Sequence, residues 1–121
     1  MSDTYSSQGS TTIAPDVILT IAQLTALKVP GVSRLSHLPG GSVNRLFQRT
    51  QLKEGVQIEI LDDIVYADLY VVLKNDVNVR DVSRNTQHDV ARAISEMVGM
   101  QVGRVNIHIE DIDYPAENNE A

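Results

Sequence analysis

The sequence predicts an α+β fold, a two-layer sandwich in which two helices pack on one face of a sheet of about four strands. Three observations indicate this fold class. The chain has 121 residues, which suits one domain with a single core. Two segments repeat their apolar residues with the helical period near 3.6, and others alternate apolar and polar residues as half-buried strands do. Along the chain the order is helix, short strand, hairpin, helix, strand.

The composition excludes several classes of protein. Hydrophobic residues make up 42% of the chain and charged residues 21%, which is typical of a folded domain. Sixteen acidic and ten basic side chains give a formal net charge of −6, which disfavours nucleic acid and acidic lipid as partners. The chain has no Cys, so it offers no disulfide, no thiol nucleophile and no thiolate metal ligand.

The chain is expected to form one domain at residues 10–114. Residues 1–9 are polar and without periodicity, and we expect a disordered N-terminal tail there. Residues 115–121 are expected to be an acidic C-terminal tail. The first residues lack the basic start and apolar run of a secretory signal, and no stretch approaches the roughly 18 apolar residues that span a bilayer. We therefore expect a cytoplasmic protein with no direct membrane insertion.

The first helix is expected to begin at Pro15, because a proline leaves no unpaired N–H in the first helical turn. Asp16 then lies near the positive end of the helix dipole. The helix ends at Pro30-Gly31, and a short strand is expected at 32–36. Two rows of residues form its apolar stripe: Val17, Ile21, Leu24 and Lys28, and beside them Ile18, Ala22, Thr25 and Val29.

Residues 42–53, after a Pro-Gly-Gly break, are ambiguous. Val43, Leu46 and Phe47 could share one face of a helical turn, with basic residues on its other side. The next two segments are clearer, since residues 56–60 and 65–73 alternate apolar and polar side chains about a turn at Asp62-Asp63. We expect an antiparallel hairpin with one solvent-exposed face.

The second helix is expected to begin after an N-cap at Asn78 and to end at Gly99, a residue favoured where the chain turns left-handed after a helix. A last half-buried strand is expected at 105–109. The helix residues expected to face the core are Val79, Val82, Thr86, Val90, Ala93, Ile94 and Met97.

If both helices cover the same face, the other face of the sheet stays open. Tyrosine provides a large contact area at low entropic cost, so this face is the expected docking surface for a partner. It would display Gln57, Glu59, Tyr66, Asp68, Tyr70, Asn106, His108 and Glu110.

Several segments in order resemble the alkaline shock protein family, also described as envelope stress response proteins. The resemblance covers roughly residues 11–112. It is carried by residues 13–18 (IAPDVI), 29–32 (VPGV), 55–56 (GV), 79–82 (VRDV), Gln87, 97–100 (MVGM) and 102–109 (VGRVNIHI).

The resemblance implies a small bacterial protein that self-associates as a homo-oligomer and lies near the membrane through a membrane-anchored partner. It carries over no catalytic residue and no cofactor. We accordingly expect a non-enzymatic scaffold or interaction protein that contacts itself and a membrane-anchored protein or a metabolic enzyme.

A metal- or small-molecule-binding accessory domain is the alternative. His108 is expected beside Glu110 on the same face, with Glu59 or Asp68 across from it, and a histidine with two carboxylates can hold a divalent metal. An ordinary cross-strand pairing explains the same residues more simply. We therefore assign no metal.

A further candidate is the basic row Arg80, Arg84, His88 and Arg92, whose spacing of four stacks it along one helix edge. It could bind an anion, or it could be a solvated face in which Arg92 and Glu96 form an i,i+4 pair. Nucleic acid is not expected as its ligand, because no aromatic residue alternates with the basic ones. Arg80, Arg84 and Arg92 are kept as candidate partner-binding residues.

No enzyme motif strengthens a catalytic interpretation. The chain has no G-x-S-x-G element and no phosphate-binding glycine pattern, and Gly40-Gly41 is better explained as a flexible turn. The adjacent acids Asp62 and Asp63 suit turn geometry and need no acid–base role.

Overall fold

The computed structural model describes residues 9–37 and 50–115. Within them no helix is long and apolar enough to cross a bilayer. The expected tails and the ambiguous turn around Val43, Leu46 and Phe47 lie almost entirely outside the described residues. The elements are α2 (Pro15–Lys28), β1 (Val32–Leu35), β2 (Thr50–Lys53), β3 (Val56–Leu61), β4 (Ile64–Lys74), α3 (Val79–Ala93), the π-helical turn η2 (Ile94–Val98) and β5 (Gln101–Asp113).

The strand β4 is the centre of a five-stranded sheet. The parallel strand β5 pairs with it from Ile64 to Lys74, along one whole edge. On the other edge β3 pairs antiparallel with the first half of β4, and β1 pairs antiparallel with its second half. The short strand β2 pairs antiparallel with β3 on the edge away from β4. The sequence did not predict this strand. Outside the β4 pairing, β5 has no strand neighbour among the described residues.

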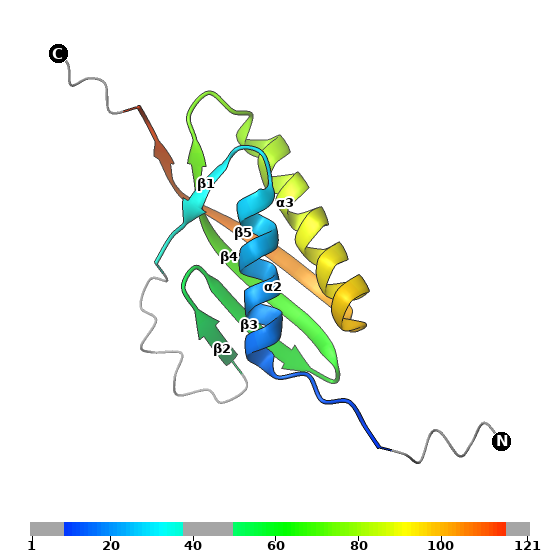
Figure 1. The fold of residues 1–121 in the computed structure, drawn as a ribbon. Coiled ribbons are helices and arrows are strands. Elements are labelled where there is room, and N and C mark those ends of the chain that lie inside the picture. Colours follow the sequence, from blue (N-terminus) through cyan, green and yellow to red (C-terminus); the bar gives the residue numbers. More distant parts are fainter. Residues whose placement is uncertain (1–8, 38–49, 116–121) are drawn as a thin grey trace.

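Both helices cover one face of this sheet, as predicted (Figure 1). The helix α2 packs on β1, β2 and β3, and α3 packs on β5 and on α2. The apolar residues between the two layers form one cluster, so the α+β two-layer fold is confirmed. The predicted turn is also confirmed, because Asp62 and Asp63 have φ of +53° and +64°, as a two-residue hairpin turn requires.

The helix α2 starts at Pro15, and Ile18, Ala22 and Val29 of the expected stripe are buried as predicted, but the rest of its buried face differs. It buries Ile18, Leu19, Ala22 and Ala26, whereas Leu24 is 55% exposed. Val17 of the expected stripe is exposed as well. Apolar residues occur on several sides of this helix, so its sequence does not fix the rotation about its axis.

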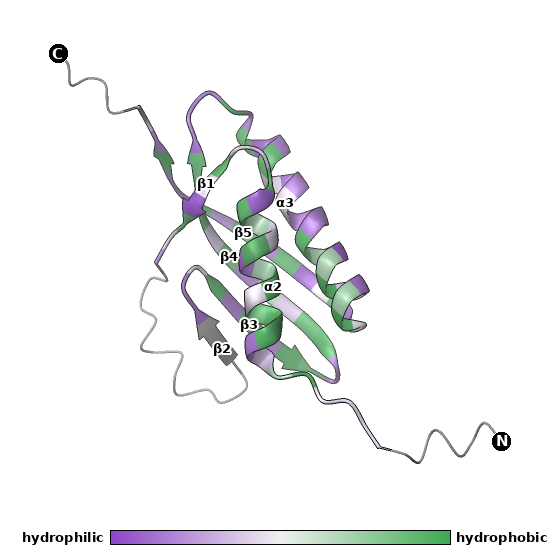
Figure 2. Cartoon of the chain, in the orientation of Figure 1, coloured by the Kyte–Doolittle hydropathy of each residue, from purple (hydrophilic) through white to green (hydrophobic). Residues whose placement is uncertain are grey.

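The helix α3 has the predicted N-cap, since the Asn78 side chain accepts a hydrogen bond from the Asp81 N–H at 3.0 Å. In Figure 2, polar and apolar residues alternate along α3. Two expected core residues are nevertheless exposed, Val79 in the first turn and Met97, which is 70% exposed. The π-helical turn explains why Met97 is exposed. Such a turn is wider than an α-helical one, so it changes the direction in which the following side chains point, and Val98 packs against the core instead.

Candidate functional site

The central strand β4 divides its side chains between the two faces of the sheet. Val65, Ala67 and Leu69 are at most 1% exposed and face the helices. Tyr66 and Tyr70 alternate with them and lie on the face that the helices leave open, as predicted. The register places three residues of β5 beside this face of β4, so we define the open-face cluster as Tyr66, Asp68, Tyr70, Arg104, Asn106 and His108.

One half of the open-face cluster is centred on Asp68. Its Oδ1 atom accepts a hydrogen bond from Asn106 Nδ2 at 3.1 Å and lies 2.9 Å from Nε2 of His108. Because a carboxylate can only accept, the ring nitrogen donates in this contact. The His108 ring also stacks on Tyr70, with ring centroids 4.4 Å apart and an angle of 11° between the planes. These contacts hold His108 in one orientation.

The other half pairs Tyr66 with Arg104, whose guanidinium carbon lies 5.2 Å from the ring centroid. This distance suits a cation–π contact. A shift of register at Gly103 puts Arg104 opposite Tyr66. A Cβ on Gly103 would lie 2.6 Å from Tyr66 Cε2, so glycine makes room for the ring. Arg104 was not among the residues expected on this face, although a glycine inside a strand is a signal for a bulge.

Glu59 lies directly opposite Tyr66 on β3, which places it beside the open-face cluster as expected. The pKa of the Tyr70 hydroxyl is raised, first by burial and then by the negative charges of Asp68 and Glu110. Tyr70 therefore keeps its proton at neutral pH and can donate a hydrogen bond to a partner.

The geometry gives little support to a metal at His108. Asp68 is the carboxylate partner of His108, as the metal-binding alternative expected. Glu59 and Glu110 do not complete a site, because the described residues contain no group of three histidine, cysteine or acidic side chains placed to hold a metal ion. One histidine and one carboxylate fall short of the ligand number that divalent metals take.

The expected basic row is divided between two sides of α3. Steps of four residues advance about 40° around a helix, so a row of four turns through roughly a third of a circle. Arg92 forms the predicted pair with Glu96, at 3.1 Å, beside α2. Arg80, Arg84 and His88 line the space between α3 and β5 instead. Arg92 is therefore not part of one anion-binding stripe with the others.

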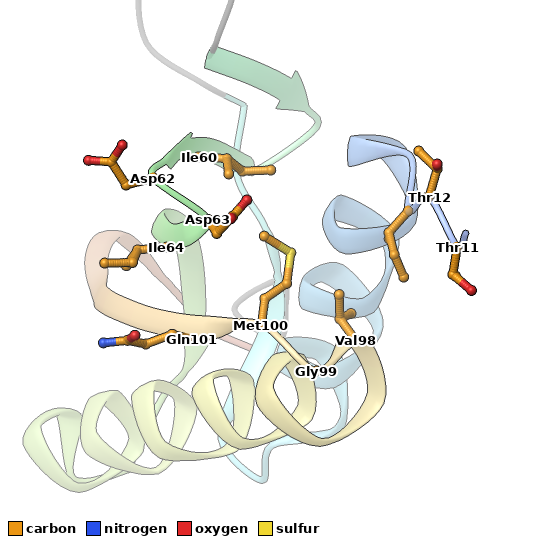
Figure 3. A pocket seen from close by; sticks show the side chains of 11 residues that line it. Thr11, Thr12, Ile60, Asp62, Asp63, Ile64, Val98, Gly99, Met100 and Gln101 are labelled. Atoms are coloured by element: carbon orange, nitrogen blue, oxygen red, sulfur yellow. The ribbon is translucent and has the colours of Figure 1, made fainter. Parts of the chain in front are cut away.

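A pocket of about 800 Å³ lies at the end of the sheet where the β3–β4 turn, the end of η2 and residues 11–13 meet. Figure 3 shows Ile60, Val98 and Met100 pointing into it, while Asp62 points outward. Its lining mixes apolar side chains with two threonines and the turn acids. The acids have the positive φ of the turn, in agreement with a role in turn geometry.

The chain is similar to known proteins over most of its length. Residues 3–114 match the model of the alkaline shock protein 23 family, described as having a cell envelope-related function. The uncharacterized protein YqhY of Bacillus subtilis (strain 168) is 29% identical over 113 residues, which cover 93% of this chain and 83% of YqhY. The uncharacterized protein Spy1535 of Streptococcus pyogenes serotype M6 is 33% identical, covering 86% of this chain and 79% of that protein.

Among solved structures, MamM-CTD 215-293 has a TM-score of 0.51. The superposition covers 81% of this chain and 99% of that one, at 12% sequence identity. At this identity the likeness concerns the fold alone.

Proposed function

Because the chain belongs to the alkaline shock protein 23 family, whose function is cell envelope-related, we propose that it is a non-enzymatic interaction protein. The family was predicted from the sequence, and the match confirms it. In this proposal the chain self-associates and also contacts a membrane-anchored or enzyme partner. It acts in the cytoplasm, near the membrane through that partner. The helix-free face of the sheet is the contact surface.

The observation that carries the proposal is the fixed arrangement of rings and polar groups on that face. The side chains of His108 and Asp68 keep 40% and 30% of their surface exposed while holding each other in place. Tyr70 is held by its stack on His108, and Tyr66 lies beneath Arg104. Side chains that are already ordered lose little conformational entropy on binding, so such a surface favours association.

The same contacts support a binding role over a catalytic one. His108 with Asp68 has the form of a general base and the group that orients it. Yet no serine or threonine of the described part of the chain is hydrogen-bonded to His108, whose ring is stacked on Tyr70. A base with no nucleophile in reach points to a structural role for the pair.

Sedimentation velocity over a range of concentrations tests self-association. We expect the protein to form species larger than the monomer, and the double variant Tyr66→Ala with Tyr70→Ala to shift toward the monomer. Tyr114→Ala is the matched control, since Tyr114 is 73% exposed and lies outside the open-face cluster. Circular dichroism melts establish that each variant is folded. A wild-type chain that is monomeric throughout, or a folded double variant that associates normally, contradicts the proposal.

The second part of the proposal is tested by affinity capture from the native host. A membrane-anchored protein or an enzyme should be retained by the wild-type chain and by Tyr114→Ala, and lost with the double variant. Equal retention by all three proteins would place the partner contact elsewhere on the molecule.

A further inference from the structure

A second surface, which adjoins the open-face cluster and shares Arg104 with it, lies between α3 and the outer edge of β5. Two adjoining pockets of about 350 and 500 Å³ run along it and share Arg84. We call it the edge groove and define it by Arg80, Arg84, His88, Arg104, Val105 and Ile109. Cationic side chains line it, and apolar side chains of β5 lie among them.

The outer edge of β5 offers backbone hydrogen-bonding groups. The Val105 carbonyl accepts a hydrogen bond from Gln87 Nε2 of α3 at 3.1 Å, so it points away from β4. Backbone groups alternate in direction along a strand, so those of Ile107 and Ile109 also point to the outer edge. No backbone hydrogen bond in the described residues occupies them. Such an edge is a template for one more strand.

The charge of the edge groove is unusual for this acidic chain. Three cations elsewhere in the described residues are paired, Arg34 with Asp113, Lys53 with Asp16 and Arg92 with Glu96. Lys28 and Lys74 form no ion pair within the described residues, but they do not adjoin the edge groove. In the same described parts of the chain, Arg80, Arg84 and His88 form no ion pair, and the contact of Arg104 is with the Tyr66 ring. The edge groove therefore keeps unneutralised positive charge in a chain of net charge −6.

We propose that the edge groove binds an extended acidic segment of a partner protein, which adds to β5 as a further strand. Its backbone pairs with Ile107 and Ile109, and its alternate side chains on the helix side are carboxylates that lie near Arg80 and Arg84. The residues between these carboxylates point to the open side of the sheet, because side chains alternate between the two faces of a strand. Backbone pairing gives affinity, and the arginines of the edge groove favour an acidic segment over a neutral or basic one.

Two other occupants fit less well. If β5 of a second copy paired here, each α3 would bring its own Arg80 and Arg84 toward the same residues of its neighbour, and like charges would repel. A single-stranded nucleic acid would match the charge, but no Phe, Tyr or Trp side chain lines the edge groove to stack with bases.

The probe for the test is a fluorescein-labelled octapeptide of alternating Glu and Val, measured by fluorescence anisotropy. We expect it to bind, and we expect Arg84→Glu to weaken it by about tenfold or more because one attractive contact becomes repulsive. Arg92→Glu is the matched control. It makes the same change of charge on the same helix, outside the edge groove, and should leave the Kd nearly unchanged.

Two control ligands separate strand addition from simple charge attraction. A peptide N-methylated at every second residue keeps the carboxylates but loses the edge hydrogen bonds, so it should bind more weakly. A peptide with Lys in place of each Glu should not bind. The proposal is overturned if the acidic peptide does not bind, if the N-methylated peptide binds equally well, if Arg92→Glu weakens binding as much as Arg84→Glu, or if a single-stranded oligonucleotide binds more tightly.

This test is independent of the proposed open-face function. The double variant Tyr66→Ala with Tyr70→Ala should bind the acidic peptide normally, and Arg84→Glu should self-associate normally. Loss of peptide binding in the double variant would mean that the peptide occupies the open face, and the edge groove would then not be its site.

Discussion

The two faces of β4 have opposite roles although they are built from alternate residues of one strand. Leu69 is fully buried and packs in the cluster beneath the helices. Its neighbours Asp68 and Tyr70 stand on the other face and contact side chains of β5. On the covered face the contacts are apolar and stabilise the fold. On the open face they are polar and aromatic, and they fix the shape of a surface that water still reaches.

Exposure alone does not mark a binding surface in this molecule. Leu24 and Met97 are the more exposed residues, yet neither forms an ordered set of contacts on the sheet. The open-face cluster is partly buried because its members cover one another. Four experiments test whether the two faces differ in energy and in order as the structure indicates.

The largest effect is expected on the covered face. Leu69→Ala should lower the free energy of unfolding by about 2–5 kcal/mol, because it leaves a cavity in a closely packed core. Tyr70→Ala, one residue along the strand, should cost clearly less, since its ring is partly exposed. Urea denaturation measures both. Equal losses would mean that the open face contributes to stability as the core does, and the comparison would fail.

Gly103→Ala should have the next largest effect. The new methyl group would lie 2.6 Å from Tyr66 Cε2 and 2.9 Å from Ile64 Cγ2, so the neighbours must move. We expect a loss of about 1–3 kcal/mol in the free energy of unfolding. In a Tyr66→Ala background the same substitution should cost less, because the ring is gone. A double-mutant cycle that is strictly additive would show that the ring does not limit the space at Gly103.

A pH-dependent effect is expected where β1 and β5 are joined across the end of β4. Arg34 donates two hydrogen bonds to the Asp113 carboxylate and Ser33 donates a third, and these contacts lower the pKa of Asp113. Because this pKa is below its value in the unfolded chain, about 3.9, the stabilisation is present at neutral pH. It is lost as the pH falls through the pKa of the folded state.

Asp113→Asn should therefore destabilise the protein at neutral pH and match the wild type in strong acid. Thermal melts across the acid range measure the difference. The control is Asp76→Asn, because Asp76 forms no ion pair within the described residues. A deficit in Asp113→Asn that persists unchanged into strong acid would mean that it does not come from the carboxylate charge.

The smallest effect concerns the Tyr70 hydroxyl, whose pKa is raised above the ordinary value near 10. Unfolded chains lose this proton first, so the contribution of Tyr70 to stability is present below pH 10 and lost as the pH rises through the folded pKa. Phenolate absorbance should show a late ionisation that is absent in Tyr70→Phe. Asp68→Asn should lower that pKa by removing a nearby negative charge. A titration unchanged in both variants would contradict the contacts assigned to Tyr70.

Some expectations failed where the local pattern carried too little information. The apolar residues of α2 are spread around the helix, so the rotation that buries Leu19 and leaves Leu24 exposed was not predictable. The π-helical turn that exposes Met97 has no marker in the residue types around it. Arg104 was missed because its position depends on the register shift at Gly103.

Residue types and their spacing were enough to predict the family, the two-layer fold class, the hairpin turn and the separation of apolar and polar residues along each strand. The family follows from the resemblance of several motifs in order, whereas the other features depend on short-range periodicity and on turn residues, which act over a few positions. The tertiary structure alone decided that β5 lies parallel to β4, and thus that His108 meets Asp68 and that Arg84 and Arg104 line one groove. Pairing between distant segments is chosen by packing of the whole chain, because many registers satisfy the same local pattern.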